Sequence, residues 1–150
     1  EVVRMRREQV AYVSQFLRVI PRVGALDVVA QPLLDAGLAP EEARRQSAEW
    51  LTRLRIPPAL WPLPPATFSG GEQQRVALAR AFVVQPAVLL ADEPTGSLDF
   101  ATGETVMKLM FELNQELGTT LVLVTHDQSI AAQCQRKITI EAGQVVPSSL

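Results

Sequence analysis

The sequence predicts an α/β fold in which a mainly parallel sheet is flanked by helices. Three short apolar runs are typical of strands, namely residues 10–13 (VAYV), 87–91 (AVLLA) and 119–125 (TTLVLVT). Stretches with helical spacing of their apolar residues separate these runs. Alternating strands and helices of this kind indicate a layered architecture with parallel strands.

The first strand is predicted over residues 10–13, followed by a loop. A turn is expected at Ile20-Pro21, because the residue before a proline is driven out of the helical region. Residues 25–34 (ALDVVAQPLL) have helical spacing, which we expect Pro32 to interrupt.

A second helix is predicted from Pro40 to Leu54. Proline followed by two glutamates suits the first turn of a helix, where the proline costs no hydrogen bond and the acids face the positive end of the dipole. Residues 56–66 contain five prolines. We expect this stretch to be a stiff connector without regular structure.

The clearest helix is predicted from Ser69 to Val84. Ser69 can cap it, and Glu72 three residues later completes a capping-box pattern. Pro86 ends the helix. The apolar run 87–91 that follows is typical of a central strand covered on both faces.

The last third of the sequence continues the alternation. We predict a helix over residues 102–117 that ends near a glycine, and a buried strand over residues 119–125. A short helix is expected over residues 127–135. Residues 137–146 resemble a strand, a turn and a second strand.

Composition bounds the class of protein. Apolar residues make up 47% and charged residues 20% of the sequence, which is typical of a soluble globular protein. The net charge of -2 gives no general attraction to nucleic acid, and we interpret the Arg4–Arg7 cluster as a solvated face. Cys134 is the single cysteine and can form no internal disulfide. No apolar run reaches the roughly 18–20 residues that cross a bilayer.

The strongest chemical signal is the acidic pair Asp92-Glu93, which directly follows the predicted strand 87–91. Ligand sites of parallel sheets lie beyond the carboxyl ends of the strands, where adjacent residues point in different directions. One carboxylate can hold Mg²⁺ while the other faces an attacking water. An isolated Asp-Glu-Pro would more simply start a turn, but the buried strand before it favours the functional interpretation.

His126, the only histidine, follows the strand 119–125 and is expected at the same edge of the sheet. A lone histidine is usually a surface residue, and its alignment with the acidic pair is what favours a role toward phosphate. Asp127 alone is ambiguous, since an aspartate at this place can simply cap the helix that follows. Ser69-Gly70-Gly71 opens a helix, which also favours phosphate binding.

Together these residues resemble the ATP-binding subunit of the ABC (ATP-binding cassette) ATPases. Five motifs in order carry the resemblance: Gln15 as the Q-loop glutamine, Phe68–Glu72 as the signature motif (with Phe and Glu for the usual Leu and Gln), Leu89–Asp92 as Walker B followed by Glu93, Ser97–Asp99 as the D-loop, and His126 as the switch histidine.

The resemblance implies a P-loop NTPase-type fold and an ATPase that acts as a dimer with ATP and Mg²⁺. Asp92 would bind Mg²⁺, Glu93 would act as general base on water, and His126 would contact the γ-phosphate. Gln15 would touch the metal and the attacking water. Ser69, Gly70 and Gly71 would bind the γ-phosphate of a nucleotide held mainly by the second subunit. The resemblance also implies Glu72, Ser97 and Asp99 as nucleotide-binding residues, with Ser97 and Asp99 along the dimer interface.

The main departure from the family pattern concerns the Walker A loop, since no Gly-Lys-Ser/Thr occurs in the 150 residues. We therefore expect a partial ABC ATPase domain that by itself binds ATP weakly and is inactive. Within it we predict a helical subdomain over about residues 16–68, the signature helix, Walker B, D-loop and switch over residues 69–136, and a strand hairpin over residues 137–150.

The interval between Gln15 and Ser69 is too short for the coiled-coil arms of the chromosome-maintenance ATPases of this superfamily, and favours the transporter type. Residues 13–22, 31–35 and 60–75 resemble the accessory ATPase of the bacterial carbon–phosphorus lyase system for phosphonate breakdown. The motifs ADEPTGSLD and VTHD resemble lipoprotein-release and macrolide-export ATPases equally well.

Three functions follow from these resemblances. The favoured one is an ATPase of phosphonate metabolism that works with carbon–phosphorus lyase subunits in the cytoplasm. The second is the ATPase of an exporter, held at the inner membrane by a permease that binds the region 15–65. The third is an interaction module that does not hydrolyse ATP, against which Glu93 and His126 argue.

Overall fold

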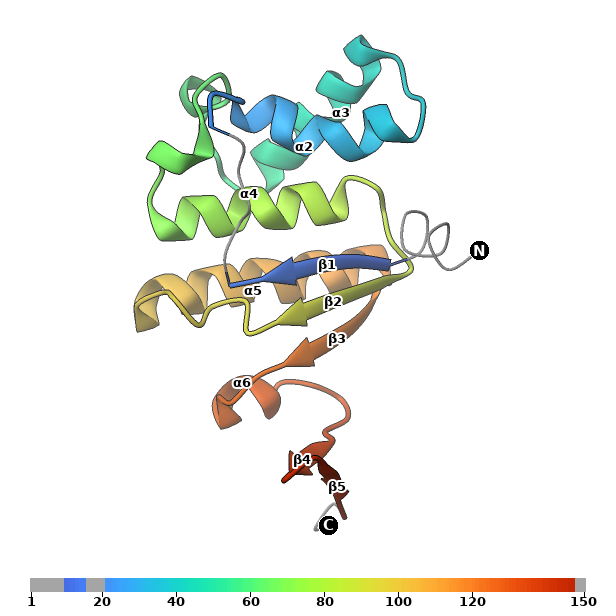
Figure 1. Ribbon diagram of the computed structural model, residues 1–150, viewed down its shortest axis with the longest axis vertical. Helices are drawn as coiled ribbons and strands as arrows, with labels where there is room; N and C mark the ends of the chain where they lie inside the picture. Colours follow the sequence, from blue (N-terminus) through green and yellow to red (C-terminus); the bar gives the residue numbers. More distant parts are fainter. Residues whose placement is uncertain (1–9, 16–20, 148–150) are drawn as a thin grey trace.

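The computed structural model describes residues 10–15 and 21–147 (Figure 1). The Arg4–Arg7 cluster and Ile20 of the expected turn lie outside these ranges. A parallel sheet occupies the middle of the molecule, helices lie on one side of it, and a small hairpin lies at the carboxyl-terminal end (Figure 1). The predicted α/β class is therefore confirmed.

The sheet has three strands, β1 (Val10–Ser14), β2 (Val88–Asp92) and β3 (Thr120–Val124), in the order β1-β2-β3. Both pairings are parallel. The register sets Ser14, Asp92 and Val124 side by side. The carboxyl ends of all three strands therefore meet at one edge, as the sequence predicted.

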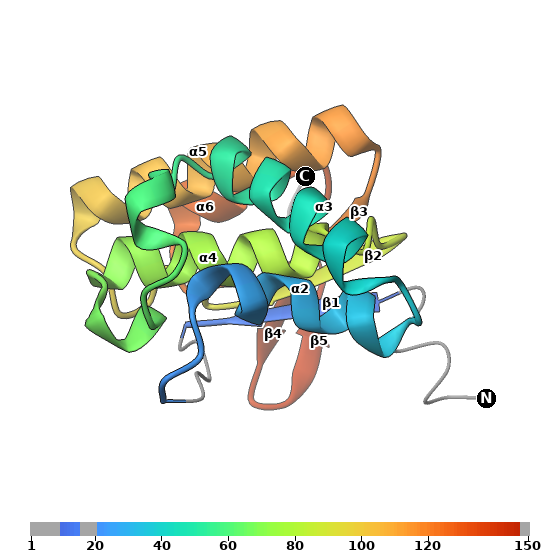
Figure 2. The same ribbon diagram turned by 90° about the horizontal axis from the view of Figure 1, so that it is seen from above.

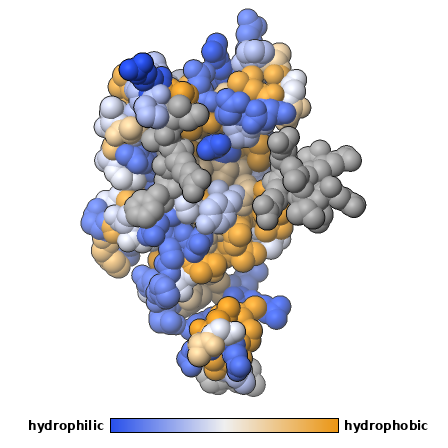
Figure 3. All heavy atoms as spheres, in the orientation of Figure 1, coloured by the Kyte–Doolittle hydropathy of each residue, from blue (hydrophilic) through white to orange (hydrophobic). Residues whose placement is uncertain are grey.

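One face of the sheet carries the core. Leu89 and Ala91 of β2 are fully buried against it, together with Val13 of β1. The opposite face is open in the described part of the chain, where Tyr12 is 58% and Val122 is 45% exposed. Figure 3 shows apolar surface over the strands and the hairpin.

The predictions that β2 is covered on both faces and that β3 is buried are thus wrong for the described residues. Side chains alternate between the two faces of a strand, so every second residue of each strand points to the open face. In β3 these are Thr120, Val122 and Val124, all exposed. Continuous apolar sequence could not reveal this, because it looks the same on both faces.

Helices α4 (Gly70–Phe82) and α5 (Phe100–Leu117) lie side by side beneath α2 (Ala25–Asp35) and α3 (Pro40–Arg53) (Figure 2). Trp50 of α3 stacks on Phe82 of α4 with ring centroids 5.8 Å apart. The Arg53 guanidinium lies 4.9 Å over the Trp50 ring and pairs with Glu116 of α5 at 2.8 Å. These contacts join the small helical layer to the two helices on the sheet.

The expected interruption at Pro32 does not occur, since α2 runs through it. A proline inside a helix costs roughly 3 kcal/mol. Val29 and Ala30, both fully buried, with Val28 and Leu33, form the buried face of α2 that offsets this cost.

The connector at residues 56–66 also differs from expectation, because it contains one short 3₁₀ turn and the start of another, η1 (Pro58–Leu60) and η2 (Pro65–Thr67). Each begins with a proline, whose fixed φ suits a first helical position. Carbonyls of this connector accept hydrogen bonds from the first N–H groups of α2. The Ala25 N–H donates to the Leu63 carbonyl and the Leu26 N–H donates to the Trp61 carbonyl, both at 3.0 Å.

The capping box of α4 is confirmed. Ser69 Oγ accepts from the Glu72 N–H at 3.2 Å, and a Glu72 carboxylate oxygen accepts from the Ser69 N–H at 3.0 Å. Helix α5 begins at Phe100, two residues earlier than predicted, because Asp99 caps it by accepting from the Thr102 N–H. It ends at Gly118 in the left-handed conformation, with φ 67°.

Helix α6 (Gln128–Ala131) is shorter than the predicted 127–135. The hairpin is confirmed as β4 (Thr139–Glu141) paired antiparallel with β5 (Gln144–Val146). Among the described residues, no helix is both long and apolar enough to cross a membrane. The proposed division into segments at residues 68 and 136 stays a prediction.

Candidate functional site

The acidic pair lies where β2 leaves the sheet, and its two carboxylates diverge. Asp92 is the last residue of β2, and Glu93 adopts a left-handed conformation with φ 47°. The Glu93 N–H donates to the Val124 carbonyl at 2.8 Å, and the Glu93 carbonyl accepts from the Gly96 N–H at 3.0 Å. These bonds hold a backbone conformation that costs a non-glycine residue about 1–3 kcal/mol.

The Glu93 side chain points toward the end of β3. Its Oε1 atom lies 3.3 Å from Nε2 of His126, a side chain that is 99% exposed. The same Oε1 atom is buried and accepts no hydrogen bond. Leaving a buried carboxylate oxygen without a donor is unfavourable. Strain and an unsatisfied oxygen at one residue are characteristic of functional sites, because folding alone gives no reason for them.

Asp92 is bound on the open face of the sheet. The Tyr12 hydroxyl donates to Asp92 Oδ2 at 3.3 Å. The pKa of the Tyr12 phenol is raised, first by desolvation and then by the charge and hydrogen bond of Asp92. A role for Tyr12 was not predicted from the sequence. Its place two residues before Ser14, which pairs with Asp92, puts its side chain on the same face of the sheet as Asp92.

Gln15 lies against the turn that follows the acidic pair. The Ser97 hydroxyl donates to the Gln15 carbonyl at 3.1 Å. A Cβ atom added at Gly96 would lie 2.4 Å from Gln15 Oε1, so the glutamine amide rests on the glycine backbone. The structure thus brings Gln15 and Ser97 together beside Glu93, a contact that the sequence did not predict, and identifies Gly96 as the residue that makes the approach possible.

The described residues contain no cluster of three or more His, Cys, Asp or Glu side chains that could hold a metal. Mg²⁺ does not require one, since it is commonly bound through one or two carboxylates together with waters and substrate phosphates. Asp92 lies on the open face of the sheet, and Gln15 directly follows Ser14, the residue paired with Asp92 in the neighbouring strand. This arrangement fits that mode of Mg²⁺ binding.

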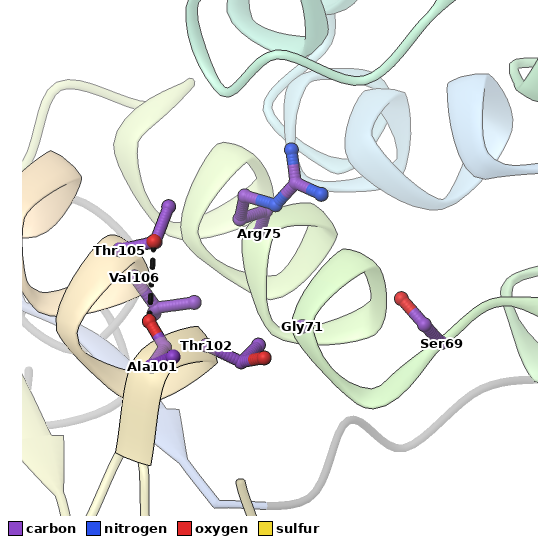
Figure 4. Close-up of a pocket in the computed structure, with 7 residues that line it drawn as sticks. All are labelled: Ser69, Gly71, Arg75, Ala101, Thr102, Thr105 and Val106. Atoms are coloured by element: carbon purple, nitrogen blue, oxygen red, sulfur yellow. Dashed lines mark hydrogen bonds between the residues drawn. The ribbon is translucent and has the colours of Figure 1, made fainter. Parts of the chain in front are cut away.

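The signature residues occupy a different place, against the start of α5. A Cβ atom at Gly70 would lie 3.0 Å from Leu98 Cδ2, and one at Gly71 would lie 2.4 Å from Thr102 Cγ2. Gly71 therefore permits a close approach of α4 to α5, and Gly70 permits one to the segment just before α5. A cavity of about 370 Å³ opens here (Figure 4), lined by Ser69, Gly71, Arg75, Ala101, Thr102, Thr105 and Val106.

The charged side chains Arg75 and Asp99 near this cavity make hydrogen bonds to the backbone. Arg75 donates to the carbonyls of Leu54 and Arg55 at the end of α3, at 3.1 and 2.9 Å. Burial, its largest influence, lowers the pKa of Arg75. The pKa of Asp99 is lowered by its side-chain and backbone hydrogen bonds with Thr102. The expected role of Asp99 at a subunit interface remains a prediction.

Sequence reasoning missed one buried polar residue, Gln74 of α4, which is 2% exposed. Its Nε2 atom donates to the carbonyls of Ser14 and Pro94, both at 2.6 Å. A signal was available, because Gln74 lies three residues after Gly71 and four before Leu78, both buried. A polar residue on the buried stripe of a helix needs a specific partner.

Comparisons with known proteins agree with this geometry. A family model described as ABC transporter matches residues 1–96. The lipoprotein-releasing system ATP-binding protein LolD of Idiomarina loihiensis is 46% identical over 138 residues, which cover 92% of this chain and 60% of that protein. The uncharacterized ABC transporter ATP-binding protein YbbA of Escherichia coli K12 is 46% identical over 142 residues, which cover 95% of this chain and 62% of that protein.

A similar solved structure is the dimeric, post-hydrolysis state of the ATP-binding cassette MJ0796, bound to ADP and Pi. It has a TM-score of 0.84 and 38% identity over 96% of this chain and 63% of that one. The chain spans about 60% of the length of the LolD and YbbA proteins. These relatives give no support to the phosphonate resemblance and favour the lipoprotein-release alternative. The family match and the P-loop NTPase fold of the solved cassettes show that the chain belongs to the ABC transporter family.

Proposed function

We propose that the whole protein, of which these residues form part, hydrolyses MgATP as a dimer and drives an ABC exporter of the lipoprotein-release type. The observation that carries the hydrolytic part is the pairing of Glu93 and His126 at the carboxyl edge of the sheet, 3.3 Å apart. The exporter part rests on likeness to LolD proteins.

Phosphoryl transfer asks the protein mainly to position groups and to neutralise charge. Glu93 would take the proton from the water that attacks the γ-phosphate, for which its unsatisfied Oε1 atom is available. The exposed imidazole of His126 would donate to a phosphate oxygen. Asp92 would hold Mg²⁺, which when bound neutralises part of the phosphate charge. Gln15 would orient the water from its place on Gly96.

The signature residues would serve the nucleotide of a second subunit. They face the cavity beside α5 and pack against Leu98 and Thr102 rather than against Glu93. The amino end of α4 presents the positive end of the helix dipole, which favours a phosphate. The related MJ0796 cassette is dimeric, and this supports a shared nucleotide. Binding of ATP by the 150 residues alone is still expected to be weak.

The partner would be a membrane permease, and attachment to the inner membrane would follow from it. The alternative partner, the carbon–phosphorus lyase subunits, rests only on the resemblance of residues 13–22, 31–35 and 60–75. Purification of the full-length protein with its partners separates the two. Co-purification with lyase subunits, and with no permease, would contradict the exporter proposal.

The hydrolytic proposal is tested with the full-length Glu93→Gln variant, which keeps the size of the side chain and removes the base. Loss of a general base lowers kcat by about 10²–10⁴-fold. Glu104→Gln on the exposed side of α5 is the matched control and should hydrolyse ATP like the wild type. Undiminished hydrolysis by Glu93→Gln would remove Glu93 from this role.

A further inference from the structure

Gln74 binds two chain segments that are distant in sequence. Its single amide nitrogen has two hydrogens, and they are donated to the Ser14 carbonyl at the end of β1 and to the Pro94 carbonyl after β2. Both distances are 2.6 Å, and the residue is 2% exposed. Buried bonds of this kind are strong and leave little room for adjustment, because water cannot replace them.

Each of the two carbonyls lies one residue from a site residue. Ser14 directly precedes Gln15, and Pro94 directly follows Glu93. Ser14 is the last residue of β1, where that strand leaves the sheet, whereas Pro94 lies beyond the end of β2 and follows Glu93 with its strained φ of 47°. The backbone there depends on other bonds for its position. Gln74 supplies one tie between the two segments, and the bond from Ser97 to the Gln15 carbonyl supplies another.

The amide also connects these segments to α4. Gln74 lies three residues after Gly71, one helical turn from the signature glycines. A displacement of the amino end of α4 therefore acts on the carbonyls beside Gln15 and Glu93 through one side chain.

We propose that Gln74 is a positioning residue that sets Gln15 and Glu93 relative to each other and to the signature helix. The proposal rests on the proposed ATP hydrolysis, in which Glu93 is the base. Gln74 is buried, and its amide nitrogen donates to the two backbone carbonyls. It acts by fixing the backbone on which the water-activating groups are mounted, so its loss should lower kcat rather than weaken substrate binding.

The test uses the full-length protein and compares Gln74→Met, which fills the same space without donors, with the wild type. We expect kcat for MgATP to fall about 10–100-fold, in line with the loss of buried hydrogen bonds, while KM changes less than about threefold. Gln73→Met is the control, because the amide of Gln73 donates only to the Phe68 carbonyl on its own segment among the hydrogen bonds of the described residues. It should keep wild-type kcat.

A second arm separates positioning from a purely structural role. If Gln74 acts through Glu93, then Gln74→Met should cause little further loss in the Glu93→Gln background. An equal fold-loss in both backgrounds, or an unchanged kcat at a temperature well below the unfolding midpoint, would overturn the proposal. Should Gln74→Met fail to fold, Gln74→Glu replaces it, since it has the same size and sets a carboxylate against the two carbonyls.

The outcomes also distinguish failure of the positioning role of Gln74 from failure of the proposed ATP hydrolysis. Wild-type hydrolysis that is sensitive to Glu93→Gln but insensitive to Gln74→Met would overturn only the positioning role. Wild-type hydrolysis that is insensitive to Glu93→Gln would overturn the proposed function itself, and the positioning role with it.

Discussion

Nε2 of His126 lies 3.3 Å from Oε1 of Glu93, and the two side chains have very different surroundings. The imidazole is 99% exposed, whereas the carboxylate oxygen is buried. The pair therefore has one member fixed by the fold and one that extends freely into solvent. A catalytic base needs a fixed position, as the buried Glu93 carboxylate has. A group that closes on an incoming phosphate needs freedom to move, as the exposed His126 imidazole has.

This asymmetry predicts that His126→Ala removes activity without affecting the fold. We expect ATP hydrolysis by the full-length protein to fall about 100-fold, as for the loss of a donor to developing charge. The unfolding midpoint should stay at the wild-type value, because the side chain is not packed. Phosphate release and thermal unfolding measure the two. Gln133→Ala, also exposed beyond β3, is the control, and a lowered midpoint in His126→Ala would contradict the structure.

The raised pKa of Tyr12 predicts an alkaline transition. The folded-state pKa lies above the usual 10.0, so the stability contributed by the phenol is present below pH 10 and is lost as pH rises through the folded pKa. Tyr12 is the single tyrosine of the chain, so phenolate absorbance reports it directly. Asp92→Asn should bring the transition back toward pH 10. A transition unaffected by this substitution would show that the hydroxyl does not bind Asp92.

Local features of the fold were predictable, and those that depend on strand alignment were not. The capping box of Ser69 and Glu72 uses residues three apart and was confirmed. The contacts of Tyr12 with Asp92 and of Gln74 with Ser14 join residues 80 and 60 positions apart. Such contacts need the order and register of β1 and β2, which no local pattern contains.

The wrong predictions have the same origin. Pro32 is unfavourable in a helix by itself, but the burial of Val29 and Ala30 was not visible before the helices were placed. The exposure of β3 likewise depends on which elements cover the sheet.

Acid is predicted to weaken the outer face of α3. Hydrogen bonds from Arg45, and secondly from Gln46, lower the pKa of Glu42 to about 2 from the usual 4.5. A lowered folded-state pKa gives stability that is present above pH 4.5 and is lost as pH falls toward 2. The unfolding midpoints of wild type and Glu42→Gln should therefore differ at pH 7 and converge only as pH falls through about 2. A difference that is constant with pH would show that the ion pair contributes nothing.

The close approach of α4 to α5 predicts a compensating pair of substitutions. The Cβ atom of Gly71→Ala would lie 2.4 Å from Thr102 Cγ2, which forces a shift in a packed contact. Overpacking of this kind costs about 1–3 kcal/mol, more than alanine gains in helix propensity. Thr102→Ser removes the methyl group and keeps the hydroxyl, so the double variant should recover most of the loss. Urea unfolding of the two single variants and the double variant measures the coupling. Additive losses would mean that the two helices are not in contact at this point.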